Sequence, residues 1–446
     1  MAVHEAERIR DAVAQIGDEL AETLAAAIRI PSINPAYPGV DRESVLGGEG
    51  EMARFMAGIY EDLSCETTLF HVEEGRDNAI GYFRGYGDGR SLILNGHHDV
   101  VPVGDPSLWT EAEPFEGKVD PDRVWGRGAS DMKGGIVAQT YALKALQLAG
   151  IRLRGDLILE SVSAEETGQY RLGTGAAIER GVRADAAIVA EPSGPALLAV
   201  GPCSTGLLVF RMQVTGRATH AGMRGSTIYP GGDGYDLGVS AIDKGLLLMD
   251  GISRLENQWS RSKRHPFFPP GHFTIMPGVI EGAPVGARIP YYVPDSFAVE
   301  YVVWYPPSEE PEAIKQEIEG FVDALARTDD WLIAHPPAIT WVKDTPGASL
   351  DPAHPLCQEL LEAHTLAARN KPEYLVEPRI QGFLGAEETI RFQQAGIPAI
   401  NYGPGDIRLA HAANEHVMRD ELVTACTTYA IFAMRWCGFD MVKTTI

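Results

Sequence analysis

Histidine and carboxylate side chains follow short apolar runs in this chain, a pattern typical of buried α/β strands that end at a ligand site. The clearest case is SLILNGHHDVVP (residues 91–102), where apolar residues 92–94 lead to His97 and then to Asp99. Imidazole nitrogen is the commonest protein metal ligand, and a nearby carboxylate can fix its tautomer and orientation. His97 is therefore a candidate metal ligand, with Asp99 as its partner. A hydrogen-bonded structural histidine is the alternative.

More candidate ligands occur downstream. They are Asp131 in GRGASDMKGG, Glu165 and Glu166 in SVSAEETG, Glu191 in AIVAEPS and His411 in LAHAANEHV. Adjacent carboxylates are usually a solvated acidic pair, but this Glu-Glu pair directly follows an apolar strand, where successive side chains point different ways. Together the residues supply five nitrogen or oxygen donors and a spare carboxylate. Such a set can hold a pair of divalent cations that share a bridging carboxylate.

The order of the segments GHHDVVP, WGRGASDMKGG, AEETG, AEPS and AHAANEHV resembles the M20 family of metallopeptidases and amidohydrolases over nearly the whole chain. The resemblance implies roles for individual residues. His97, Asp131 and Glu191 would hold one ion; Asp131, Glu166 and His411 would hold the second; Glu165 would be the general base. His220, in VTGRATHAG, matches a histidine that reaches the partner subunit's site in dimeric relatives and stabilises an oxyanion. We therefore expect a homodimer or a higher homo-oligomer.

The composition is that of a globular protein and restricts the partners. The chain has 446 residues, of which 45% are hydrophobic and 22% charged, enough for two domains. The net charge of −23 argues against nucleic acid or an anionic membrane as a partner. The five cysteines lack a C-x-x-C pair, so neither disulfides nor a thiolate metal site is expected. No secretory signal or membrane span is visible, which predicts a cytoplasmic protein.

Strands alternating with helices predict a three-layer, mostly parallel α/β sheet. We expect its strands near residues 91–94, 156–162, 186–189 and 399–402, with helices at 136–148 and 356–368. From about Gly206 the pattern changes to a smaller α+β unit with strands near 207–214, 273–275, 297–303 and 338–342. This unit resembles the inserted lid and dimerisation domain of the family. The predicted boundaries are 1–205 and 347–446 for the two halves of the catalytic domain and 206–346 for the insert.

The segments that bind substrate in the family differ here. The family's lid usually carries an Asn ahead of Val-Pro-Asp and an Arg near the end of the next strand, whereas this chain has Tyr291 and Trp304. GFLGAEE (residues 382–388) replaces a usual Gly-Gly-Thr/Ser-Asp segment. Loss of the bidentate guanidinium and gain of two aromatic rings favour an aromatic or apolar substrate. Candidates for a relocated anion contact are Arg288, Arg379 and Arg408, although each is more often a surface arginine.

These observations predict a dinuclear metal-dependent hydrolase that cleaves a C–N bond, of amide type, in a small aromatic or apolar molecule. A metal-activated water and Glu165 would carry out the reaction. The ligand types suit Zn, Mn and Co equally. One alternative is a hydrolytic deaminase of an aromatic amine such as an aminobenzoate, which would use the same site. The other is a non-enzymatic binding protein on the same fold.

Overall fold

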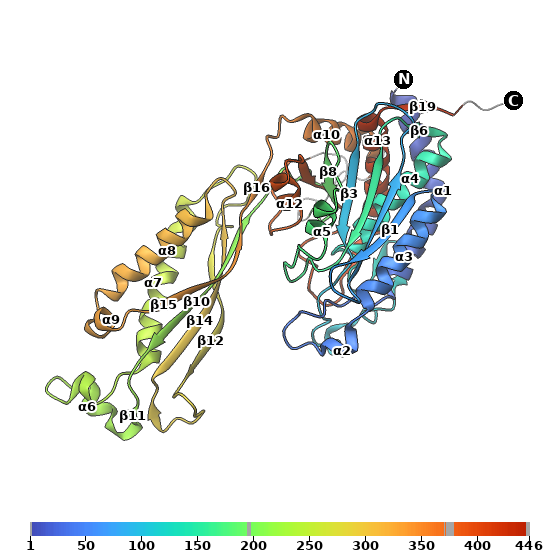
Figure 1. The fold of residues 1–446 in the computed structure, drawn as a ribbon. Helices are drawn as coiled ribbons and strands as arrows, with labels where there is room; N and C mark the ends of the chain where they lie inside the picture. Colours follow the sequence, from blue (N-terminus) through green and yellow to red (C-terminus); the bar gives the residue numbers. More distant parts are fainter. Residues whose placement is uncertain (1, 194–197, 370, 372–378, 443–446) are drawn as a thin grey trace. The chain divides into compact units, whose positions relative to one another are not determined.

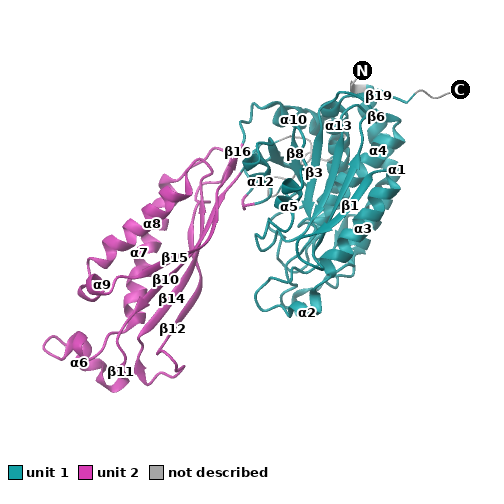
Figure 2. Ribbon diagram, in the orientation of Figure 1, with its two compact units in different colours: residues 1–203, 350–383, 387–446 teal, residues 204–349, 384–386 magenta. Residues whose placement is uncertain are grey.

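The computed structural model describes residues 2–193, 198–369, 371 and 379–442, which form two compact units (Figure 2). Unit 1 contains Met1–Cys203, Leu350–Phe383 and Glu387–Ile446, and unit 2 contains Ser204–Ser349 with Leu384–Ala386. Unit 2 is thus inserted between two long segments of unit 1. Within the described residues, no helix is long and apolar enough to cross a membrane.

A six-stranded mixed sheet forms the centre of unit 1 (Figure 1). Its strands, in spatial order, are β1 (Glu66–His71), β2 (Asp77–Phe83), β7 (Leu157–Val162), β3 (Leu92–His97), β8 (Ala187–Val189) and β17 (Ala399–Asn401). The last four strands run parallel, whereas β2, near one edge, pairs antiparallel with both β7 and the edge strand β1. The strands β3 and β7 are buried along their whole length, and each begins in the sequence with three consecutive apolar residues, 92–94 and 157–159. The predicted α/β fold with a largely parallel sheet is confirmed.

Helices cover both faces of this sheet. Successive strand residues point to opposite faces. On one face, a side chain added at Gly96 would contact Ile136 of α4 (Lys133–Leu148). On the other face, the side chain of the neighbouring Asn95 donates a hydrogen bond to the hydroxyl of Thr174 in α5 (Thr174–Glu179). The layer that contains α4 also contains α1 (Ala2–Ile28), α10 (Pro355–Ala367) and α13 (Arg419–Cys437), while α12 (Thr389–Gln394) packs near α5. The sheet therefore lies between two helical layers, as a three-layer fold requires.

Unit 2 is built on a four-stranded antiparallel sheet. Its order is β12 (Ile275–Ala283), β14 (Ser296–Tyr305), β10 (Gly206–Thr215) and β15 (Ala338–Thr345). The helices α7 (Ala241–Ser262) and α8 (Pro311–Ala326) pack together and contribute to a second hydrophobic core. The hydroxyl of Ser240 caps α7 by accepting a hydrogen bond from the Asp243 amide at 3.2 Å.

The remaining helices and strands complete both units. They are α2 (Arg42–Val45), α3 (Gly48–Asp62), β4 (Lys118–Val119), β5 (Arg123–Trp125), β6 (Ile151–Leu153), β9 (Cys203–Ser204), β11 (Thr219–His220), α6 (Arg224–Ile228), β13 (Tyr292–Val293), α9 (Asp330–Ala334), β16 (Ala348–Ser349), β18 (His416–Met418) and β19 (Phe439–Met441). The pairing of β5 with β18 is important for the site, because it brings the loop before α4 next to the loop that follows β17.

Candidate metal centre

Parallel strands deliver the candidate ligands to one edge of the central sheet. His97 is the last residue of β3, Glu165 and Glu166 follow β7, and Glu191 follows β8. Because β3 runs parallel to both β7 and β8, these residues lie at the same carboxyl edge. Asp131 lies in the loop that leads into α4, and α4 is the helix that packs against β3. Local sequence thus places each side chain at the end of a buried element.

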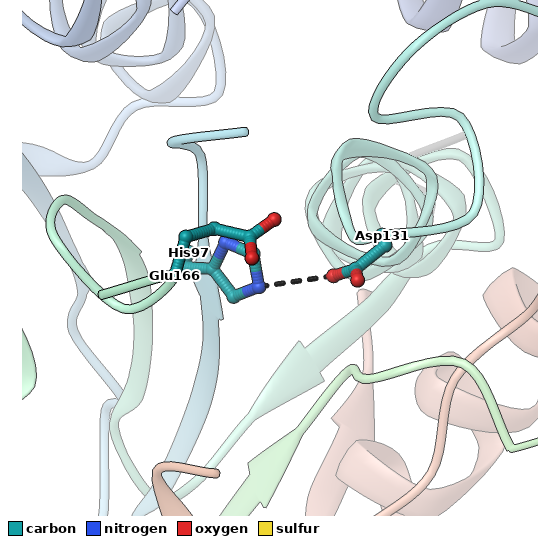
Figure 3. A group of neighbouring side chains, drawn as sticks. All are labelled: His97, Asp131 and Glu166. Carbon is teal, nitrogen blue, oxygen red and sulfur yellow. Dashed lines mark hydrogen bonds and ion pairs between the residues drawn. The ribbon is translucent and has the colours of Figure 1, made fainter. Parts of the chain in front are cut away.

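His97 lies among three carboxylates. Its Nε2 is 3.1 Å from Oδ1 of Asp131, 3.2 Å from Oε1 of Glu191 and 3.9 Å from Oε2 of Glu165. Figure 3 shows the ring of His97 directed at Asp131, with the Glu166 carboxylate alongside. Ligand atoms of His97, Asp131 and Glu166 lie within 4.8 Å of one another, as do those of His97, Glu165 and Glu191.

Asp131 also faces the second histidine. His411 Nε2 is 3.3 Å from the other Asp131 oxygen, Oδ2, and 3.0 Å from Oε2 of Glu166. Each carboxylate oxygen of Asp131 therefore points to a different histidine. His411 holds its position with a left-handed backbone, at φ 63°, a conformation that is uncommon outside glycine and that occurs often in functional sites. The structure brings all five predicted ligands and Glu165 together.

The cluster carries more acidic groups than its histidines can neutralise. Burial, followed by the negative charge of Asp131, raises the pKa of Glu166 to about 8 and that of Glu191 well above its usual range. Burial opposes the charged form of His97, but the charge of Glu191 and hydrogen bonds to Asp131 and Glu191 outweigh it, so the pKa of His97 lies well above its ordinary value. In addition, Oε1 of Glu166 is buried without a hydrogen-bond partner. A set of imidazole and carboxylate ligands in which the carboxylates outnumber the histidines fits divalent cations such as zinc or manganese.

Comparison with known proteins identifies the family. A model of peptidase family M20/M25/M40 matches residues 93–435. This chain belongs to that family. It is 34% identical over 433 residues, 94% of either chain, to the N-formyl-4-amino-5-aminomethyl-2-methylpyrimidine deformylase of Bacillus subtilis. The protein of the same name from Halalkalibacterium halodurans is 34% identical over 390 residues, 84% of this chain and 87% of the relative.

The fold agrees with this assignment. The solved structure of an M20 family metallo-carboxypeptidase from Sulfolobus solfataricus has a TM-score of 0.66 at 19% identity, covering 93% of this chain and 98% of the other. The predicted resemblance is confirmed, and the chain is an M20 hydrolase of carbon–nitrogen bonds. Since M20 metallopeptidases use divalent metals, membership also supports a metal cofactor. It removes the alternative of a non-enzymatic binding protein.

Asp99 organises the centre of this M20 hydrolase in a way that differs from the sequence-based expectation. The group closest to His97 Nδ1 is the backbone carbonyl of Asp99, at 2.9 Å, whereas the Asp99 carboxylate is 3.6 Å away. The carbonyl accepts the Nδ1 proton and leaves Nε2 available for a metal. The carboxylate instead accepts the amides of Glu165 and Glu166, each at 3.1 Å, and the side chain of Asn34 at 2.8 Å. Asp99 therefore anchors the Glu-Glu loop.

A buried ion pair that sequence reasoning missed supports Asp131. Oε1 of Glu415 accepts the backbone N–H groups of Gly128, Ser130 and Asp131, each at 3.0 Å. Its other oxygen accepts from the Arg127 guanidinium at 2.5 Å, and both side chains are buried. Both residues lie inside segments already noted for their neighbours, WGRGASDMKGG and AHAANEHV. Their position within a few residues of Asp131 and His411 was the available signal. Asn34, close to two prolines, offered none.

The remaining predicted residues are not part of this cluster. His220, Arg288, Tyr291 and Trp304 belong to unit 2, and Arg379 is an exposed residue of unit 1 whose carbonyl accepts from Val200. Arg408 is exposed and pairs with Asp406.

That Tyr291 and Trp304 both contact the substrate stays a prediction. Tyr291 directly precedes β13 and is 66% exposed, whereas Trp304 is the penultimate residue of β14. The chain from Ser296 to Trp304 is an extended strand, and eight residues of strand span about 26 Å. Nearly the whole length of β14 therefore lies between the two positions along the chain.

Proposed function

We propose that this M20 hydrolase is a dinuclear metal-dependent amidohydrolase that removes a small acyl group, such as formyl, from the nitrogen of an aromatic substrate. The observation that carries the proposal is the position of Asp131, which presents one oxygen to His97 and the other to His411. Such a carboxylate suits a bridging role between two ions. His97, Asp131 and Glu191 would hold one ion, and Asp131, Glu166 and His411 the other. The ions supply Lewis acidity, which polarises the scissile carbonyl and acidifies water.

Glu165 is the proposed general base. Its carboxylate lies near the ligands of the first ion, at 3.9 Å from His97 Nε2, and its backbone is fixed by Asp99. The preceding residue, Ala164, adopts φ 72°, so the loop that presents Glu165 has an uncommon backbone conformation. We propose that Glu165 accepts a proton from the attacking water and donates it to the leaving nitrogen.

The proposed substrate class combines the sequence with the relatives. The absence of the usual Asn and Arg from the lid disfavours a free amino acid derivative, and the two relatives are named for an N-formylated aminomethylpyrimidine. A small heteroaromatic N-formyl amine satisfies both observations. The products would be formate and the free amine.

We also propose that residues 206–346 act as a lid and dimerisation domain, with His220 serving the partner subunit's site. His220 is exposed, and its Nδ1 accepts the Gly222 amide at 3.1 Å. The proton therefore resides on Nε2, which can donate to an oxyanion.

The test is activity of protein reloaded with zinc, manganese or cobalt. The panel contains the N-formylated aminomethylpyrimidine, N-acetylornithine, N-succinyl-diaminopimelate and an aminobenzoate. We expect formate release from the pyrimidine and weak activity on the two aliphatic amino acid derivatives. Ammonia release from the aminobenzoate would instead establish the deaminase alternative. Elemental analysis should find about two ions per chain. Full activity with a single ion in both wild type and Asp131→Ala would refute the dinuclear proposal.

A further inference from the structure

Glu388 is a buried carboxylate that has no part in the proposed metal centre. Its residue is 1% exposed, and its Oε2 is buried without a hydrogen-bond partner. Among the residues that the structure describes, none forms an ion pair with it. A carboxyl oxygen in such surroundings is costly to leave unpaired. Such a group in a native protein requires an explanation, and a ligand that supplies the missing partner is one.

The topology places Glu388 at the catalytic edge of the sheet. It immediately precedes α12, which packs against β17 and β8 and is followed by β17 after a turn at Gly396. Since β17 runs parallel to β8, a helix that returns the chain to the start of β17 begins near the carboxyl edge. That edge carries His97 and Glu191. Electrostatics agree with this placement, because burial and then the negative charge of Glu165 raise the pKa of Glu388 well above its ordinary value.

The neighbouring Glu387 has a different use. Its Oε2 accepts the Thr389 amide at 2.6 Å, and its Oε1 accepts the Thr389 hydroxyl. Glu387 therefore stabilises the start of α12, whereas Glu388 retains an unpaired oxygen. Both belong to GFLGAEE, the segment that departs from the family pattern. The pair thus provides a test residue and a matched control of the same type, adjacent in sequence and equally buried.

We propose that Glu388 determines substrate specificity by accepting a hydrogen bond from an amino group on the substrate's heteroaromatic ring. This inference rests on the proposed function. An aminopyrimidine edge presents an N–H donor beside a ring-nitrogen acceptor, and a carboxyl group offers the complementary pair of atoms. A buried polar group that is satisfied only by the correct substrate discriminates strongly against an analogue that lacks the donor.

The experiment compares two substrates that differ only in the ring amino group: the N-formylated 4-amino-5-aminomethyl-2-methylpyrimidine and its 4-desamino analogue. Wild type should prefer the amino compound in kcat/KM by at least ~100-fold. Glu388→Met should reduce the ratio to within about tenfold of unity, whereas Glu388→Gln, which keeps an acceptor and a donor, should retain most of it. Glu387→Gln should leave the ratio unchanged. Calorimetric binding of 4-amino-2-methylpyrimidine and 2-methylpyrimidine to the metal-free protein should show the same order.

The outcomes separate this inference from the function on which it rests. Hydrolysis of both pyrimidines at equal rates by wild type would overturn the role of Glu388 and leave the deformylase activity standing, even if Glu388→Met fails to fold. An unchanged ratio in Glu388→Met, or a loss in Glu388→Gln as severe as in Glu388→Met, would also overturn it. Hydrolysis of neither pyrimidine, while another amide of the panel is cleaved, would refute the substrate class and this inference together.

Discussion

Replacing Glu415 with alanine should destabilise unit 1 by about 4 kcal/mol or more. The substitution removes the acceptor of three backbone N–H groups, those of Gly128, Ser130 and Asp131, and strands the buried Arg127 guanidinium. An orphaned buried donor costs about 1–3 kcal/mol, and breaking one side of a buried ion pair costs about 3–5 kcal/mol. The low ends of these ranges add up to about 6 kcal/mol for three donors and one ion pair, and water that enters the vacated space offsets part of this sum, which leaves about 4 kcal/mol.

Urea denaturation of the metal-free protein measures this loss without interference from bound ions. The double variant Arg127→Met, Glu415→Ala should recover at least about 1 kcal/mol relative to Glu415→Ala alone, because the unpaired charge is gone. Glu66→Ala is the matched control: its partner Arg84 is 53% exposed, and loss of such a surface pair costs roughly 0–1 kcal/mol. A Glu415→Ala effect no larger than that of Glu66→Ala would refute the reasoning.

Three further predictions concern catalysis, assembly and pH. Glu165→Gln should keep both ions and lose turnover by ~100–10,000-fold, whereas Glu166→Ala should lose one ion on elemental analysis; exchanged phenotypes would contradict the assignment. Mixed dimers of inactive His220→Ala and inactive Glu165→Ala subunits should regain part of the activity, and proven mixed dimers without activity would exclude a shared site. Burial raises the pKa of Glu160 from 4.5 to about 7, so its contribution to stability is complete below pH ~4.5 and is lost as pH rises through 7. Glu160→Gln should therefore gain up to about 3 kcal/mol relative to wild type between pH 4.5 and 8 in urea denaturation, and a pH-independent difference would refute this.

The site was predictable where local sequence and topology coincide. His97 and Glu191 end apolar runs, and the rule that parallel strands share a carboxyl edge was sufficient to bring them together. His411 lies in the loop beyond β17, with no apolar run directly before it, and only the family resemblance assigned it to the second ion. The roles of Asn34 and Glu415 could not be predicted, because each depends on hydrogen-bond partners far away in the sequence. Asn34 donates to Asp99, 65 residues away, and the partners of Glu415 lie 284 to 288 residues away.

The missed elements have equally physical reasons. The helix α13 is buried around almost its whole circumference, so it lacks the one-sided apolar stripe by which a surface helix is recognised. The strand β12 was predicted only near residues 273–275, since Pro277 and Gly278 interrupt a pattern that in fact continues to Ala283. The structure accommodates them with a register shift between Pro277 and Val279.

The insertion of unit 2 also sets the order in which the protein can be completed during synthesis. The helix α13, which packs against α1 and α4, ends at Cys437, whereas the first segment of unit 1 is finished at Cys203. At about 5–20 residues per second, a ribosome needs roughly 10–50 s to make the intervening chain. Throughout that interval the apolar faces of α1 and α4 lack their partner helix. The nascent chain therefore exposes these apolar faces before His411 and Glu415 have been synthesised. We expect aggregation or chaperone binding in this interval.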